Sequence, residues 1–136
     1  MDITTSILNN LITLFGQDVT VYRENVKAGF KEDSFFIPAA SAKSKGQLND
    51  TNNIVLSCQV IYFPRLNNIN DDIQAVMDNL LINFNKVGKT YITNRDFTIS
   101  DDSLVFTFDV MVLTKPLTDG APFKTIDTKG RDKDGR

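Results

Sequence analysis

Apolar residues recur at helical spacing in two stretches of the chain, residues 2–16 and residues 70–87. Side chains three and four positions apart lie on one side of a helix, so both stretches predict amphipathic helices. Gly16 is placed to end the first helix. In the second helix, Asn70 is the expected N-cap, and Gly88 is the residue expected directly after the C-terminal end. The two apolar faces are Ile3, Ile7, Leu8, Leu11, Leu14 and Phe15, and Ile73, Val76, Met77, Leu80, Leu81 and Phe84.

The remaining apolar residues alternate with polar ones, which is the period of strands. Strands are predicted over residues 19–23, 34–40, 54–63, 91–99 and 104–114. Residues 54–63 and 104–114 carry apolar groups on both faces, so these strands are central or another subunit covers one face. The pattern predicts an α+β fold. It has a mixed, mostly antiparallel sheet of about five strands, in the order α-β-β-β-α-β-β, with both amphipathic helices packed on one face.

A polar stretch separates the second predicted strand from the third. Residues 41–53 contain almost no apolar side chain and predict a long polar excursion, with the extended tip of a hairpin as the alternative; Lys43 and Lys45 make its first half basic. Pro38 lacks a backbone donor, so it predicts an edge position or an early end to pairing.

The chain changes character again after Pro116. We expect residues 1–116 to form a single domain and residues 117–136 to form a flexible, solvated tail. The alternative is that Phe123 and Ile126 anchor the tail as an arm on a neighbouring subunit.

The composition argues against several classes of function. The formal net charge of −2 and the pI near 5.0 argue against a protein that binds nucleic acid by neutralising phosphates. The chain has no histidine and one cysteine, so it lacks the commonest general base, the usual zinc ligands and any internal disulfide. Cys58 lies in an apolar strand and is expected to be buried and unreactive. No apolar run is long enough to span a membrane, and we expect synthesis in a reducing cytoplasm.

The carboxylates do not form a recognisable catalytic arrangement. Asp71-Asp72 open a predicted helix and Asp101-Asp102 lie in a predicted turn. We interpret Asp109, alone in a strand, as a rim or interface residue, with a hydrolase that uses it as the alternative. We therefore expect no enzymatic activity, cofactor or metal. The residues predict an oligomeric assembly protein, with a small intracellular ligand-binding domain as an alternative from a different class.

The loop between the first two strands carries a recognisable pattern. Residues 22–31 read aromatic-x-Glu-x-Val-x-x-Gly-Phe-Lys, and Ser-Phe-Phe-Ile follows at residues 34–37. With Tyr62-Phe63-Pro64, this pattern resembles the phage tail terminator family over roughly residues 2–114. Gly29 is expected to have a positive φ. Asp33 departs from the family, whose members often carry proline there, so we expect a looser start to the strand that follows.

The resemblance implies a structural protein of a virion or phage-tail-like particle, assembled in the bacterial host cytoplasm. Such proteins are expected to form a homohexameric ring at the tail end nearest the head. The ring caps the tail tube, stops tube polymerisation and meets neck or sheath proteins. The resemblance implies no cofactor, membrane or specific nucleic-acid binding. A neck or head-completion connector is the alternative within the same setting.

A closed ring needs two different patches on each subunit. We expect one patch on the sheet face that the helices leave open and the other on the loop. An acidic ring would also line its channel with charge that repels DNA phosphates. The expected interface residues with self or tube are Glu24, Lys27, Gly29, Phe30 and Lys31 on the loop, and Lys43 and Lys45 in the polar stretch.

Overall fold

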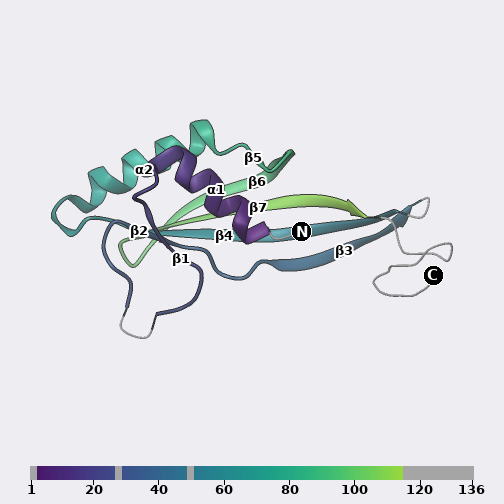
Figure 1. Ribbon diagram of the computed structural model, residues 1–136, viewed down its shortest axis with the longest axis horizontal. Coiled ribbons are helices and arrows are strands. Elements are labelled where there is room, and N and C mark those ends of the chain that lie inside the picture. Colours follow the sequence, from purple (N-terminus) through teal and green to yellow (C-terminus); the bar gives the residue numbers. More distant parts are fainter. Residues whose placement is uncertain (1–2, 27–28, 49–50, 115–136) are drawn as a thin grey trace.

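Two helices lie on one face of a long sheet in the computed structural model, which describes residues 3–26, 29–48 and 51–114 (Figure 1). This arrangement confirms the α+β class and the mixed, mostly antiparallel sheet. The elements are α1 (Ile3–Phe15), β1 (Thr20–Tyr22), β2 (Ser34–Phe36), β3 (Ser41–Leu48), β4 (Thr51–Phe63), a 3₁₀ turn (Leu66–Asn68), α2 (Ile69–Asn83), β5 (Lys86–Val87), β6 (Thr90–Ser100) and β7 (Ser103–Thr114). The described residues form seven strands, whereas about five were predicted. The two additional strands are β3 and β5.

Strands β4 and β7 form the centre of the sheet. Their antiparallel register runs from Asn52↔Thr114 to Tyr62↔Leu104. The sheet order is β1-β2-β4-β7-β6-β5, and β3 shares an edge of β4 with β2. All pairs are antiparallel except β1 with β2, which run parallel. The long β3–β4 hairpin and the end of β7 extend past the helices (Figure 1).

The core lies between the helices and the nearer face of the sheet. Each helix contributes three buried residues of its predicted stripe, and β4 and β7 contribute their predicted inner faces. The expectation that Leu81 belongs to this stripe is wrong, because its side chain is 49% exposed. The buried residues include Ile3, Ile7, Leu11, Ile73, Val76, Leu80, Cys58, Val60, Tyr62, Leu104, Phe106, Phe108 and Val110.

The two helices end by different means. Gly16 ends α1 as predicted, with φ 99° and its N–H donating to the Ile12 carbonyl at 2.8 Å. The predicted end of α2 is wrong, because this helix stops at Asn83 and Gly88 lies in the β5–β6 turn. The Arg95 guanidinium donates to the carbonyls of Leu81 at 2.9 Å and Phe84 at 3.3 Å. This side chain on β6 therefore satisfies terminal carbonyls that would otherwise need a glycine cap.

The predicted start of α2 is also displaced. Asn68, rather than Asn70, is the N-cap residue, and its side chain makes no capping hydrogen bond. The 3₁₀ turn that precedes the helix carries the chain directly into its first turn, so the cap falls earlier than the propensity of Asn70 suggests.

The polar stretch over residues 41–53 forms paired strands in its described parts, residues 41–48 and 51–53, as its alternative reading as a hairpin tip predicts. Its strand β3 pairs with β4 from Ser41↔Ser57 to Leu48↔Thr51. Strand pairing satisfies the backbone without any apolar side chain, which is why the polar sequence conceals the strand. The early end expected at Pro38 is confirmed, because β2 stops at Phe36 and the register on β4 has shifted by one residue when β3 begins.

Phe106 provides a test of this core. Its fully buried ring lies 4.5 Å from Phe97, 4.9 Å from Phe108 and 5.3 Å from Phe84, centroid to centroid. We expect Phe106→Ala to lower the free energy of unfolding by about 4 kcal/mol, because a large cavity opens. Denaturant unfolding measures this loss. Ile99→Ala is the control, since Ile99 is 58% exposed, and it should change stability by less than about 0.5 kcal/mol.

Candidate assembly interface

The loop over residues 23–33 is a crossover connection. Parallel strands β1 and β2 both run the same way, so the chain must return across a face of the sheet before β2 begins. The described parts of the loop, residues 23–26 and 29–33, lie on the side of the sheet opposite the helices (Figure 1). There the ring of Phe30 packs 4.6 Å from Phe63, 4.8 Å from Phe36 and 5.3 Å from Tyr22. The chain therefore covers one end of the sheet face that the sequence predicted to be open.

The structure places the predicted interface residues in two groups. Glu24, Gly29 and Lys31 are exposed on the crossover loop, while the half-buried Phe30 faces its own sheet. Lys43 is exposed on β3, where it pairs with Val55. This position is eight residues along β4 from Phe63, a separation of roughly 26 Å. Lys27 and the side chain of Lys45 lie outside the described part of the chain.

A tight turn shapes the middle of the loop. Gly29 has φ 94°, as predicted, and its N–H donates to the Val26 carbonyl at 3.0 Å. This left-handed backbone favours glycine over residues with a side chain. The turn directs the chain into Phe30 and so seats the ring on the sheet.

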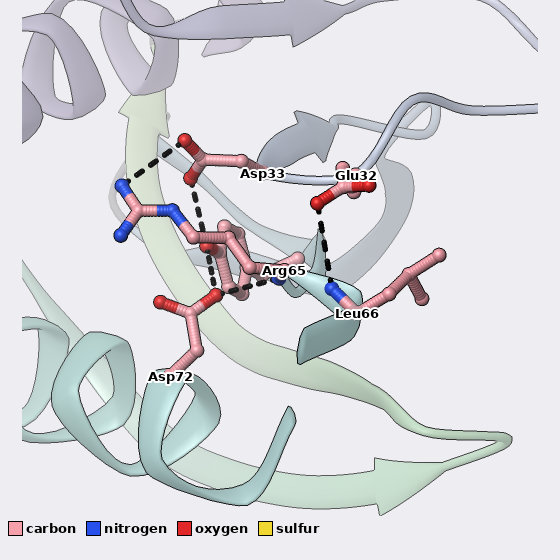
Figure 2. Close-up of polar contacts among 6 residues, drawn as sticks. Glu32, Asp33, Arg65, Leu66 and Asp72 are labelled. Atoms are coloured by element: carbon pink, nitrogen blue, oxygen red, sulfur yellow. Dashed lines mark hydrogen bonds and ion pairs between the residues drawn. The ribbon is translucent and has the colours of Figure 1, made fainter. Parts of the chain in front are cut away.

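The end of the loop is held from both sides. Ser34 is fully buried, and its hydroxyl donates to the Lys31 carbonyl at 2.6 Å. Asp33 accepts a hydrogen bond from the Tyr62 hydroxyl at 2.9 Å and pairs with the Arg65 guanidinium at 3.3 Å. Figure 2 shows Asp33 and Arg65 side by side with Asp72. The expected looser start of β2 at Asp33 is therefore wrong.

Asp33 also has a backbone that proline cannot adopt. Its φ is 57°, in the left-handed region, whereas the proline ring holds φ near −65°. The departure from the family pattern at this position is consistent with the geometry, because aspartate tolerates the left-handed region better than most residues.

Asp72 joins the same cluster from the first turn of α2. One of its oxygens lies 2.6 Å from the Tyr62 hydroxyl and accepts the backbone N–H of Arg65 at 2.8 Å. Glu32 accepts the backbone N–H of Leu66 at 3.4 Å (Figure 2). Burial, then hydrogen bonds to Asp72 and Asp33, raise the pKa of Tyr62 well above its usual value. The nearby Asp33 carboxylate raises the pKa of Arg65.

Sequence reasoning missed this cluster. Tyr62 was predicted as part of a strand face and of a motif, and Asp72 was explained by the helix dipole. Asp33 is 29 residues from Tyr62 along the chain, and Asp72 is 10 residues from it. No local pattern joins residues so far apart, so only the folded chain shows that the three side chains meet.

The open part of the sheet face is mixed in character. Ile61 and Val105 are half-buried and Met111 is exposed. Between them, the Asp109 carboxylate accepts hydrogen bonds from Ser57 at 3.2 Å and Asn94 at 2.8 Å. These partners give Asp109 a structural reason to lie in the strand. Its role as a rim or interface residue stays a prediction.

Other candidate chemistry is sparse in the described chain. Cys58 is buried as predicted, and burial together with the Asp109 charge raises the pKa of its thiol to about 11. A thiol in this state is rarely the reactive thiolate at neutral pH. Residues 3–26, 29–48 and 51–114 contain no group of three or more His, Cys, Asp or Glu side chains that could hold a metal ion. Neither described helix is long and apolar enough to cross a membrane.

Comparison with models of known protein families places the chain beside a family of tail proteins. The sequence model of the family described as phage tail terminator protein matches residues 2–122. The matched range contains both helices, the crossover loop and all the described strands. No curated protein matches the chain.

The left-handed backbone of Asp33 can be tested by substitution. We expect Asp33→Pro to lower the free energy of unfolding by about 3 kcal/mol or more, because it forbids the observed φ and removes the carboxylate. Asp33→Asn should cost clearly less, since asparagine tolerates this backbone and keeps an acceptor for Tyr62. Urea unfolding of the two variants compares them directly. Equal losses would contradict a backbone role for this position.

Tyr62 predicts a particular dependence of stability on pH. Its pKa is raised in the folded chain, so the stability that it contributes is present below about pH 10 and is lost as the pH rises further. Tyr62→Phe has no hydroxyl to ionise, so its stability lacks this decrease with rising pH. The stability advantage of the wild type over Tyr62→Phe should therefore shrink between about pH 9 and pH 11. Urea midpoints across this range measure it, with Tyr91→Phe as an exposed control, and a constant advantage would contradict the assignment.

Proposed function

The chain belongs to the phage tail terminator protein family, and on this premise we propose that it closes the end of a tail tube as a ring. The family is one of structural proteins, so the chain acts in the phage tail and contacts other tail components. The observation that carries the proposal is the match over residues 2–122, which spans the whole described fold.

The proposed ring is a homohexamer of head-to-tail contacts. Such a ring needs two different patches on each subunit. The loop residues Glu24, Gly29 and Lys31 are exposed at one end of the sheet face, and Met111 is exposed toward the other end. These features support a contact in which the loop of one copy meets the open strands of the next. Lys27, Lys43 and Lys45 belong to the proposed interface with the neighbouring copy or the tube.

Phe30 takes an indirect part in this proposal. Its ring packs on Phe36 and Phe63 of its own chain, so it shapes the loop from beneath. A substitution at Phe30 would disturb the fold as well as any contact between subunits. The exposed charge of Lys31 is therefore a cleaner probe of the interface.

The ring is proposed to dock on the last ring of the tube, at the end nearest the head. There it stops further polymerisation and presents a surface to neck or sheath proteins. Assembly takes place in the bacterial host cytoplasm and needs no cofactor. The chain carries a net charge of −2, which supports a channel that does not hold DNA by its phosphates.

The mass of the protein in solution tests the proposal. Light scattering after gel filtration, with and without the tail tube protein, should give the mass of six 15.3 kDa chains, either alone or only on tube ends. The capped tubes should also stop growing. A clean monomer that leaves tube growth unchanged would contradict the ring.

Charge reversal on the loop tests the proposed contact. Lys31→Glu should weaken ring formation or tube capping by up to about fivefold, because it replaces an attraction by a repulsion. Lys89→Glu is the matched control, since Lys89 is exposed in the β5–β6 turn. Equal behaviour of the two variants would remove Lys31 from the interface.

A further inference from the structure

A cleft of about 400 Å³ opens where the start of α2 approaches the β1–β2 end of the sheet. Its lining combines apolar side chains, Phe15, Phe35 and Val76 among them, with polar ones. Asp33, labelled in Figure 2, and its hydrogen-bond partner Tyr62 form part of its wall. The cleft is therefore braced by the same contacts that hold the crossover loop.

The cleft carries a net negative charge. Three carboxylates line it, from Asp18, Asp33 and Asp72, against the single guanidinium of Arg65. Asp33 and Asp72 are engaged by Tyr62 and Arg65. Asp18 is exposed and forms no hydrogen bond or ion pair with the described residues. An apolar floor with an acidic rim suits a segment that carries both apolar and basic side chains.

The end of the chain has this composition. Residues 121–136 contain five basic and three acidic side chains, and Lys124 lies between Phe123 and Ile126. We propose that this C-terminal segment of one copy docks in the cleft of the neighbouring copy. Phe123 and Ile126 enter the apolar floor, and Lys124 meets Asp18. The proposal deepens the proposed function and rests on it, because it names a contact that joins neighbours in the ring.

Distance favours a neighbour over the same chain. Tyr62 lines the cleft and pairs with Leu104 near the start of β7, whereas Thr114 ends β7 opposite Asn52. The ten-residue rise from Leu104 to Thr114 is roughly 33 Å. The nine residues from Thr114 to Phe123 span at most about 32 Å when fully stretched.

A chain folding back on itself would therefore have no slack with which to enter its own cleft. Figure 1 shows β7 ending far from the start of α2. In a head-to-tail ring, by contrast, the end of β7 on one subunit can lie beside the cleft of the next.

Disulfide trapping between two different chains tests the docking. One chain carries Ala75→Cys, at an exposed position on the cleft wall, and an affinity tag; the other carries Thr125→Cys, between the two proposed anchors. After mixing, assembly on tubes and mild oxidation, we expect tagged–untagged dimers on a denaturing gel. In the control, the tagged chain carries Ala42→Cys, at an exposed position on β3, in place of Ala75→Cys. The dimer yield with Ala75→Cys should be about tenfold higher than in this control, because docking raises the effective concentration of the two thiols.

Charge reversal provides the second arm. Asp18→Lys should lower the trapped yield by up to about fivefold, and adding Lys124→Glu should restore it. Asp96→Lys is the control, since Asp96 is exposed on β6. Loss of the dimers without rescue by Lys124→Glu would overturn the pairing of these two residues.

The outcomes separate this inference from the ring itself. Rings that form without trapped dimers above the Ala42→Cys level overturn the tail docking and leave the ring standing. A chain that carries both Ala75→Cys and Thr125→Cys and closes only on itself, even in rings, overturns docking between copies. A protein that stays monomeric with the tube and forms no link contradicts both proposals.

Discussion

The parallel pairing of β1 and β2 is the constraint on which the candidate interface depends. Two parallel neighbours cannot be joined by a tight turn, so residues 23–33 must cross a face of the sheet. The helices occupy one face, and the loop takes the other. The hydrophobic contact that makes this crossing stable is Phe30 on Phe36 and Phe63. Exposed residues such as Glu24 and Lys31 are then held at one end of the molecule, because the aromatic side chain of Phe30 fixes the loop to the sheet.

The crossing must also end in the right place. The chain turns into β2 through a left-handed Asp33, a conformation that costs energy unless its surroundings hold it. The Tyr62 hydroxyl and the Arg65 guanidinium hold the Asp33 side chain, and Asp72 ties the same tyrosine to α2. A tyrosine suits this position because its ring packs in the core while its hydroxyl reaches a polar partner. One side chain thus couples the loop, the central strand and a helix.

The sequence predicted both helices and the long central strands, and it missed the polar strand β3 and the two-residue strand β5. Both helices and the inner faces of β4 and β7 follow from spacing alone, because each buries one regular row of side chains. Strand β3 has no such row, and its pairing with β4 is a backbone interaction that polar residues do not reveal. The end of α2 was misplaced for a related reason: Arg95, a residue from another element, satisfies its last carbonyls.

The candidate interface was predicted in part. The loop and the positive φ of Gly29 were visible in the sequence, but the inward position of Phe30 was not. An aromatic residue in a charged loop fits a contact with a partner and a contact with its own sheet equally well. Only the crossover decides between them, since it brings the loop over Phe36 and Phe63. Sequence spacing gives no information about that crossing, because β1 is only three residues long and shows no direction of pairing.

The asymmetry of the fold explains why one chain can offer two different surfaces. The crossover loop and the acidic cleft lie toward the β1–β2 end, where Tyr62 pairs with Leu104, while the β3–β4 hairpin and the end of β7 extend the other way. A self-complementary contact would have to join like ends, whereas unlike ends join head to tail and can close into a ring. The length of β4 and β7 keeps the two ends apart. The same central strands that carry the core thereby separate the two surfaces that the proposed ring uses.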